Sequence, residues 1–349
     1  MNKESFTIAP RPLQLDSPAV SELAQKLLQS LSLRVRRVPI PPEATDISPR
    51  VAILFSGGLD CTVLARLIHD LLPKEYEVDL LNVAFENPRV IKAAATNNAP
   101  QLDSTISSPY LICPDRITGL SSHAELLRVC SDRTWRFVSI DIPYSETLAH
   151  RPQIISLIHP HDTEMDLSIA CALYFAARGS GNAHDNITTQ ASPYTTPARV
   201  FLSGLGADEL FAGYTRHAIA FERRKHQGLL AELELDFSRL GKRNLGRDDR
   251  VISHWGREAR YPYLDEALVK WALERPVWDK CGFGEMVVDK YSVEQDQSQE
   301  LEAGKKVLRL VAWKHGMRSA AAEKKRAIQF GARTAKMEGG KTKGTDTLS

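Results

Sequence analysis

Two glycine-bearing turns in this chain are placed where they could bind a phosphate group. In the first, the apolar residues 51–55 lead into Ser-Gly-Gly-Leu-Asp at 56–60, and residues 62–72 have the apolar spacing of an amphipathic helix. Glycines allow a tight turn and a close approach to a ligand, and free N–H groups at a helix start attract anions. No Gly-Lys-Ser/Thr follows, so this turn is not a Walker A loop. A Ser-Gly-Gly turn alone is more often only a turn, so it does not by itself indicate a phosphate site.

The second turn lies within residues 201–214, where Ser203 and Gly204 follow an apolar run and Asp208 opens a helical segment. A carboxylate at a helix start is often only a partner for the helix dipole. Beside a phosphate, however, Asp60 and Asp208 could hold Mg²⁺, which binds one or two protein carboxylates together with phosphate oxygens. The two motifs together favour a nucleotide site over two unrelated turns.

A third cluster of charged residues spans residues 247–250 and 254–265. Charged runs are usually solvated surfaces. Here the charges interleave with Trp255, Tyr261 and Tyr263, so part of the run must lie near the core. Charges placed there need partners, and clustered charges with partners are candidates for site residues.

The expected secondary structure would bring the two turns to one edge of a sheet. Strands are expected at residues 51–55, 77–85, 135–142 and 199–202, with helices at 62–72, 89–96, 122–130, 154–158 and 162–177. Strands that alternate with helices favour an α/β fold with a doubly wound, mostly parallel sheet, which binds ligands at the carboxyl ends of its strands. Two polar segments, residues 86–122 and 179–197, are expected to be long loops, the second of them mobile.

The chain divides into three expected parts. Residues 1–48 are expected to form a helix, at 20–33, and a proline-rich linker. Residues 49–337 are expected to form the nucleotide-binding domain, whose C-terminal part is helical. Its later helices are expected at 229–240, 265–273, 305–315 and the second half of 323–337. Residues 338–349 have nothing to bury and are expected to be a disordered tail.

Composition excludes several classes of function. The 349 residues carry 45 basic and 43 acidic side chains, a net charge of +2 that gives no general attraction to nucleic acid or membrane. The cysteines are scattered and form no Cys-x-x-Cys pair, which favours a reducing compartment over disulfides or zinc; they are Cys61, Cys113, Cys130, Cys171 and Cys281. No run of eighteen apolar residues and no signal peptide is found, so a cytoplasmic location is expected.

The chain resembles the synthetase domain of glutamine-dependent asparagine synthetases, a branch of the pyrophosphate-loop adenylating proteins. The resemblance rests on Ser-Gly-Gly-Leu-Asp at 56–60, Ser-Gly-x-Gly-Ala-Asp-Glu-Leu-Phe-x-Gly-Tyr at 203–214 and Glu-Ala-Arg-Tyr-Pro-Tyr-Leu-Asp at 258–265, in that order. Residues 305–309, Lys-Lys-Val-Leu-Arg, resemble a later lysine–arginine helix of the same domain. The similarity covers roughly residues 51–337.

This resemblance implies an ATP-dependent ligase of the adenine nucleotide alpha hydrolase-like fold. A substrate carboxylate, with aspartate as the first expectation, would attack the α-phosphate of ATP to give an acyl-adenylate and pyrophosphate, and ammonia would then form the amide. The implied nucleotide-binding residues are Phe55, Ser56, Gly57, Gly58, Asp60, Cys61, Val83, Ser203 and Gly204. Asp60 and Asp208 would carry Mg²⁺, Lys305 would stabilise developing charge, and Glu258 would assist deprotonation of the attacking nitrogen.

The chain also departs from the family pattern. Cys61 stands where a second serine is usual, and a thiol is a weaker hydrogen-bond donor. Leu205 replaces a glutamate that the family associates with aspartyl-adenylate formation, which argues against aspartate. Ala327 aligns with a late catalytic lysine, for which Lys325 or Arg326 is the expected substitute. The family's glutaminase domain, with its cysteine after the initiator methionine, does not fit before Val51, so we expect a fragment, free ammonia or a separate glutaminase.

Two alternatives to the ligase are open. One is a descendant that retains the fold and ATP binding but has an interaction or regulatory role; Leu205, Cys61 and the missing glutaminase favour it. The other is a pyrophosphate-loop enzyme that acts on a different carboxylate or on tRNA. The near-neutral charge and the lack of Cys-x-x-Cys weigh against a tRNA substrate.

Overall fold

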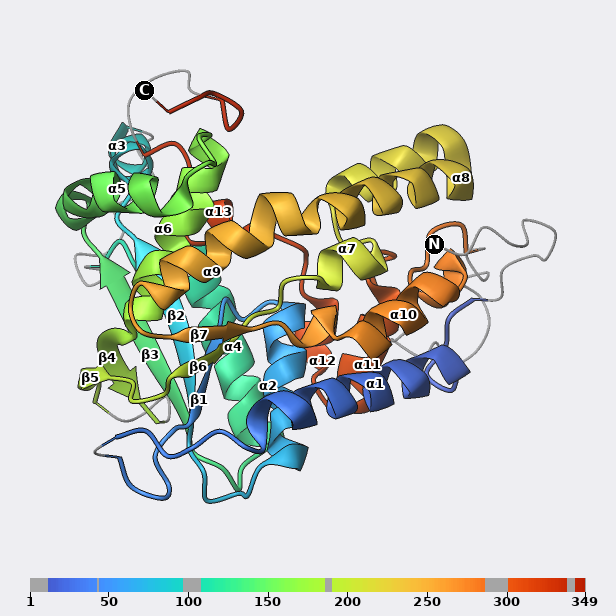
Figure 1. Ribbon diagram of the computed structural model, residues 1–349, viewed down its shortest axis with the longest axis horizontal. Coiled ribbons are helices and arrows are strands. Elements are labelled where there is room, and N and C mark those ends of the chain that lie inside the picture. The colour runs from blue at the N-terminus through green and yellow to red at the C-terminus, as the bar shows by residue number, and fades with distance from the viewer. Residues whose placement is uncertain are drawn as a thin grey trace.

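The computed structural model describes residues 12–42, 44–96, 108–185, 190–285, 301–337 and 343–348. Over those residues, its centre is a seven-stranded sheet in the order β5-β4-β3-β2-β1-β6-β7 (Figure 1). The strands are β1 (Val51–Leu54), β2 (Val78–Phe85), β3 (Trp135–Ile142), β4 (Ser180–His184), β5 (Ser192–Thr195), β6 (Val200–Leu202) and β7 (Glu258–Arg260). Strands β3, β2, β1, β6 and β7 run parallel, whereas β4 is antiparallel to both β3 and β5. The expected fold class is confirmed.

Helices cover both faces of the sheet because both faces are apolar. Val51 and Ile53 of β1 belong to one core and Ala52 to another, as the alternation of side chains along a strand requires. The first core joins the sheet to α1 (Pro18–Val35), α2 (Leu59–Leu71), α4 (Pro114–Val129), α7 (Ala207–Phe211), α10 (Glu266–Glu274), α11 (Lys306–Lys314) and α12 (Arg318–Ala322). The second joins it to α5 (Tyr144–Ile158), α6 (Glu164–Arg178), α9 (Gly246–Ser253) and α13 (Ile328–Gly331).

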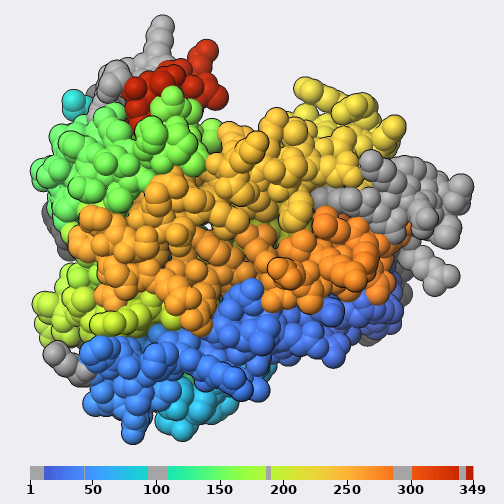
Figure 2. Space-filling view, in the orientation of Figure 1, coloured from blue at the N-terminus to red at the C-terminus, as the bar shows by residue number. Residues whose placement is uncertain are grey.

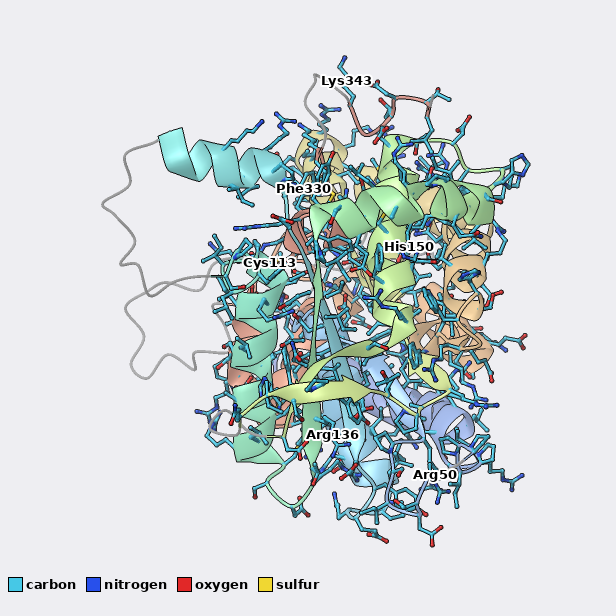
Figure 3. The ribbon with its side chains drawn as sticks, turned by 90° about the vertical axis from the view of Figure 1, so that its left-hand side faces the viewer. Arg50, Cys113, Arg136, His150, Phe330 and Lys343 are labelled. Atoms are coloured by element: carbon cyan, nitrogen blue, oxygen red, sulfur yellow. The ribbon has the colours of Figure 1, made fainter. Side chains whose placement is uncertain are left out.

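The remaining helical elements lie outside these two layers or connect them. They are α3 (Pro88–Thr96), α8 (Thr215–Leu240), the π-helical turn η1 (Gly241–Leu245) and the 3₁₀ turns η2 (Pro262–Leu264) and η3 (Val277–Asp279). Figure 3 shows α3 projecting from the body of the molecule, whereas α4 lies along it.

Helix α6 shows how local sequence sets the ends of an element. Thr163 caps its start, where the hydroxyl oxygen accepts a hydrogen bond from the Asp166 N–H at 3.2 Å. Gly179 ends it in the left-handed conformation with φ of 73°. The capping residues and the terminating glycine are both recognisable in the sequence.

The β4–β5 hairpin corrects the expectation of a mobile loop over residues 179–197. Its Gly, Asn and Ser residues have low strand propensity, so the pattern contains no strand signal. The pairing depends instead on tertiary contacts: the Tyr194 hydroxyl donates to the buried Asp79 carboxylate at 2.9 Å, and the Arg136 guanidinium lies 4.9 Å from the Tyr194 ring centre. Figure 3 shows Arg136 where the hairpin crosses the sheet.

Helix α8 consists of two helical segments, because the backbone at Arg224 and Lys225 is non-helical. The expected helix 229–240 lies within the second segment, whereas the first segment, which begins at Thr215, lies outside it. Its C-terminal end continues through η1 into α9 without a break. The first half lacks an apolar stripe because few of its side chains are buried, so periodicity could not detect it.

Two terminal segments make contacts with the body of the protein. Val20, Leu23 and Leu27 of α1 are fully buried in the first core, and Figure 2 shows α1 in blue beside the orange α10 segment. Thr347, which lies within the expected tail, forms an isolated backbone bridge with Thr163. Among the described residues, no helix has both the length and the apolar character to span a membrane.

Candidate active site

A cavity of about 270 Å³ lies at the carboxyl ends of β1 and β6, beside residues 81–83 of β2. From β1 the chain crosses to β2 on one side, and β6 pairs with β1 on the other. Such a reversal of strand order leaves a crevice between the connecting loops, which is the usual ligand site of an open α/β sheet. Both glycine-bearing turns line this cavity.

The first turn is held open by close packing against α4. Gly57 has a φ of +78°, and a Cβ there would lie 2.4 Å from the backbone nitrogen of Gly119. The Ser122 hydroxyl donates to the Gly57 carbonyl at 2.7 Å, which fixes the turn from the same helix. Gly57 therefore shapes the loop from behind, whereas Ser56 and Gly58 line the cavity.

Cys61, at the position where a serine is usual, also lines the cavity. Its thiol donates to the Gly58 carbonyl at 3.3 Å and lies 3.7 Å from the Ser56 hydroxyl. Burial raises the pKa of the thiol to about 11, so Cys61 is neutral at physiological pH. It can offer a phosphate only a weak hydrogen bond.

The second turn approaches the first so closely that only glycine fits at the contact. A Cβ on Gly204 would lie 2.9 Å from the Cβ of Asp60. Leu205 follows, with its N–H donating to the Ser203 hydroxyl at 3.3 Å, and it lines the cavity. The turn thus brings Asp208, in α7, opposite Asp60, at the start of α2.

A lysine bridges these two carboxylates. Lys305 Nζ lies 2.8 and 2.9 Å from the two carboxylate oxygens of Asp60 and 2.9 Å from Asp208 Oδ1. Lys325 donates to Asp208 Oδ2. Burial alone would raise the pKa of Asp208, but the ammonium groups of Lys305 and Lys325 outweigh it and hold that pKa well below its usual range. The sequence anticipated Lys325 as one of two substitutes for the missing late lysine.

A backbone hydrogen bond positions the loop that carries Lys305. Lys305 has a left-handed φ of 57° at the start of α11, and its N–H donates to the Phe211 carbonyl at 2.9 Å. Its side chain is only 3% exposed. Burial would lower the pKa of Lys305, but the two aspartates raise it, so the ammonium stays charged.

An apolar wall completes one side of the cavity. Phe55 directly follows β1 and Val83 lies within β2, and both line the cavity. The α6 residues Ile169, Ala172 and Leu173 extend this wall. A flat aromatic base could be buried here while its phosphates face the glycine turns.

Glu258 is not brought to the cavity. It pairs in register with Val200 at the amino end of β6, whereas the Ser203–Gly204 turn follows the carboxyl end of that strand. Its side chain is 61% exposed and forms an ion pair with Arg260 at 2.8 Å. The expected role of Glu258 in proton transfer therefore has no support in the geometry.

Arg247 and Asp248, from the same charged cluster of the sequence, line the cavity instead. Arg247 donates to Asp248 at 2.8 Å and to Asp166 at 2.7 Å, and Arg247 and Asp248 are both buried. Burial raises the pKa of Asp248, with Arg247 opposing the shift. The interleaving of charged and aromatic residues indicated that this cluster lies near the core, but it did not identify which charges line the site.

Asp115 is a cavity residue that the sequence analysis missed. It lies in the first turn of α4 within a segment expected to be a loop, so no motif marked it. Burial raises its pKa to about 7, against the lowering effect of Arg326 and Lys325. Arg326 itself donates to the Thr118 hydroxyl at 3.3 Å.

Sequence comparison with known proteins gives the same family as the glycine-turn motifs indicate. Residues 221–312 match the asparagine synthase family. The chain is 39% identical over 332 residues to asparagine synthetase domain-containing protein 1 of Gallus gallus, an alignment that covers 88% of this chain and 50% of that protein. The similarity to that group of proteins, which residues 80–87, 212–217 and 326–333 indicate in the sequence, is confirmed for the chain as a whole.

More distant relatives carry similar names. An asparagine synthetase domain-containing protein of Saccharomyces cerevisiae is 36% identical over 346 residues, which are 96% of this chain and 58% of the yeast protein. A putative glutamine-hydrolyzing asparagine synthetase of Methanocaldococcus jannaschii is 47% identical over 79 residues, 23% of this chain and 15% of that protein. The chain spans about half the length of the eukaryotic relatives that it matches.

Proposed function

We propose that this chain is an asparagine synthetase-like ATP-dependent ligase. It would activate a carboxylate, with aspartate as the first candidate, as an acyl-adenylate with release of pyrophosphate. Ammonia, free or from a separate glutaminase, would then form the amide and release AMP. The observation that carries this proposal is that two glycine turns, two aspartates and two lysines surround one cavity at the switch point of the sheet.

The residues of the cavity would act mainly by positioning. Ser56 and the backbone of Gly58 would bind the phosphates at the start of α2, while Phe55 and Val83 would contact the base. The ammonium groups of Lys305 and Lys325 would offset the negative charge that develops when the carboxylate attacks the α-phosphate. Nucleotidyl transfer of this kind needs orientation and cations more than a protein nucleophile.

Mg²⁺ fits this site only together with phosphate. Asp60 and Asp208 offer carboxylate oxygens, and among the described residues no cluster of three or more His, Cys, Asp or Glu residues could hold a metal. Two carboxylates plus phosphate oxygens are a usual ligand set for Mg²⁺. When bound, the ion would neutralise charge on the departing pyrophosphate.

Pyrophosphate release tests the proposal. Purified protein is incubated with Mg·ATP, aspartate and ammonia, and ATP binding is measured in parallel by calorimetry. We expect carboxylate-dependent pyrophosphate release that Asp208→Ala abolishes. Binding of ATP without pyrophosphate release with any amino acid would reject the ligase, and release that survives Asp208→Ala would reject the assignment of Asp208.

A second candidate is an ATP-binding protein without ligase activity, with an interaction or regulatory role. Leu205 in the cavity wall favours it, because leucine cannot replace the hydrogen bonds of a carboxylate. The exposed position of Glu258 favours it as well. Leu205→Glu separates the two candidates: a gain in aspartate-dependent pyrophosphate release, absent in the matched Leu205→Gln, would support a ligase scaffold that lacks only this carboxylate.

A further inference from the structure

Lys305 Nζ lies where a cation bridging Asp60 and Asp208 would be placed. It is within 2.9 Å of three of the four oxygens of these carboxylates, and Lys325 takes the fourth. The contact with Asp208 Oδ1 is an ion pair without good hydrogen-bond angles. Both aspartates are therefore already neutralised by lysines that line the same cavity.

We propose that Lys305 is a resident counter-ion that closes the Asp60–Asp208 site to Mg²⁺ until a polyphosphate draws its ammonium group away. The metal then enters only together with the nucleotide. This inference rests on the proposed function, since it concerns the order of binding in the same cavity.

The net charge of the two aspartates and two lysines disfavours Mg²⁺ before a polyphosphate binds. Two carboxylates and two ammonium groups cancel, so a divalent cation added while both lysines remain would leave an excess of positive charge in a nearly buried cluster. Mg²⁺ also needs near-octahedral oxygen ligands at about 2.0–2.1 Å, which an ammonium held against the same oxygens excludes. Polyphosphate supplies both the missing negative charge and the missing oxygens.

Lys305 can change partners without a change in the fold. Its backbone is fixed by the hydrogen bond from its N–H to the Phe211 carbonyl, so only the long side chain has to move. The phosphate-binding turn is adjacent, because Asp60 belongs to the first turn of α2, which that turn precedes. The displaced ammonium would thus find phosphate oxygens close to its starting position.

Metal binding without nucleotide tests the counter-ion role. Mn²⁺ replaces Mg²⁺ as the probe because it also prefers carboxylate oxygens. Its affinity is measured by calorimetry for the wild-type chain and for Lys305→Met. We expect Lys305→Met to bind Mn²⁺ at least about tenfold more tightly, because the carboxylates of Asp60 and Asp208 lose a competing cation. Adding Asp208→Asn to Lys305→Met should abolish this gain.

Two further variants are matched controls. Lys305→Arg keeps the positive charge and should show no gain. Lys306→Met removes an equally buried lysine of the same helix, which pairs with Glu285 and touches neither aspartate, and should also show no gain. Equal Mn²⁺ affinity of wild type and Lys305→Met, lost with Asp208→Asn, would overturn the proposal.

If the Lys305→Met variant does not fold, a measurement on the wild-type chain still tests the proposal. Mn²⁺ binding is compared with and without inorganic pyrophosphate; we expect saturable binding only with pyrophosphate, and equal binding without it would overturn the proposal. Failure of the proposed function would give a different result from failure of the counter-ion role. The wild type would then bind neither ATP nor pyrophosphate, while Lys305→Met would still gain Mn²⁺ affinity.

Discussion

At the scale of residues, the site depends on close backbone approach as much as on charged groups. Gly204 allows the second turn to contact Asp60, and Gly57 allows the first turn to contact α4. Neither glycine has a side chain to act on a ligand. Their role is to let Asp60 and Asp208 face the same lysine, which larger residues at these positions would prevent.

We predict that Gly204→Ala weakens ATP binding about tenfold or more while the fold is retained. The new Cβ would lie 2.9 Å from the Asp60 Cβ, and relieving such overpacking typically costs about 1–3 kcal/mol. Calorimetry gives the affinity and circular dichroism the fold. Gly241→Ala is the control, since no heavy atom lies within 4 Å of its Cβ position. Equal loss of affinity in both variants would contradict the steric argument.

At the scale of elements, the β4–β5 hairpin is attached through a buried carboxylate. Asp79, on β2, is fully buried and accepts the hydrogen bond from Tyr194, on β5. Burial raises the pKa of Asp79 to about 7, although hydrogen bonds from Thr196 and Tyr194 and the charge of Arg136 oppose the shift. The hairpin is thus bonded to a β2 carboxyl group whose ionisation is coupled to folding.

We predict that Tyr194→Phe lowers the free energy of unfolding by about 1–3 kcal/mol, because the buried carboxylate of Asp79 loses one of its hydrogen-bond donors. Urea denaturation measures the change. Thr195→Val removes an exposed hydrogen bond of the same hairpin, to Ser180, and should change stability by less than about 0.5 kcal/mol. Similar losses in the two variants would show that the bond to Asp79 is unimportant.

A pH dependence follows from the same carboxyl group. Its pKa is higher in the folded protein than the ordinary value of 3.8, so between about pH 4 and about pH 7 the folded state binds more protons than the unfolded state. The contribution of Asp79 to stability is therefore complete below pH 4 and is lost as pH rises through 7. Asp79→Asn should remove this part of the slope in unfolding experiments at a series of pH values. An unchanged slope would contradict the assignment.

At the scale of the whole molecule, we infer that the N-terminal helix folds as part of the main body. Helix α1 packs against α2, α10 and α11, and the hydroxyl of Ser30 donates to the Pro262 carbonyl at 2.6 Å. Arg34 pairs with Asp265 at 2.9 Å in the same region. The segment that includes η2 and the start of α10 is thus held against α1.

We predict that Leu27→Ala, at a fully buried position of α1, lowers the free energy of unfolding by about 2–5 kcal/mol. Leu33→Ala on the same helix is the control: Leu33 is 76% exposed, so its loss should change stability by less than about 0.5 kcal/mol. Both are measured by denaturation of the full chain. A negligible effect of Leu27→Ala would show that α1 folds independently of the main body.

The sequence by itself determined the fold class, the two turns and the residues of those turns that line the cavity. An apolar run between turn residues marks β1 and most of β2, because a buried parallel strand is apolar on both faces, whereas β3 alternates apolar residues with Arg136, Ser139 and Asp141. Ser56, Asp60 and Asp208 were identified because glycine turns and carboxylates at helix starts are local patterns. The sequence also identified Lys305 through its resemblance to the family motif.

Only the tertiary structure decided which charges meet. Glu258 lies in a matching motif yet points away from the cavity, whereas Asp115 and Asp248 line it without a motif of their own. The β4–β5 hairpin likewise has no strand pattern, because its pairing depends on Asp79 from a distant strand. Local spacing cannot specify such contacts, since they depend on how strands and loops far apart in the chain are packed together. The lysine bridge between Asp60 and Asp208 is a contact of the same kind.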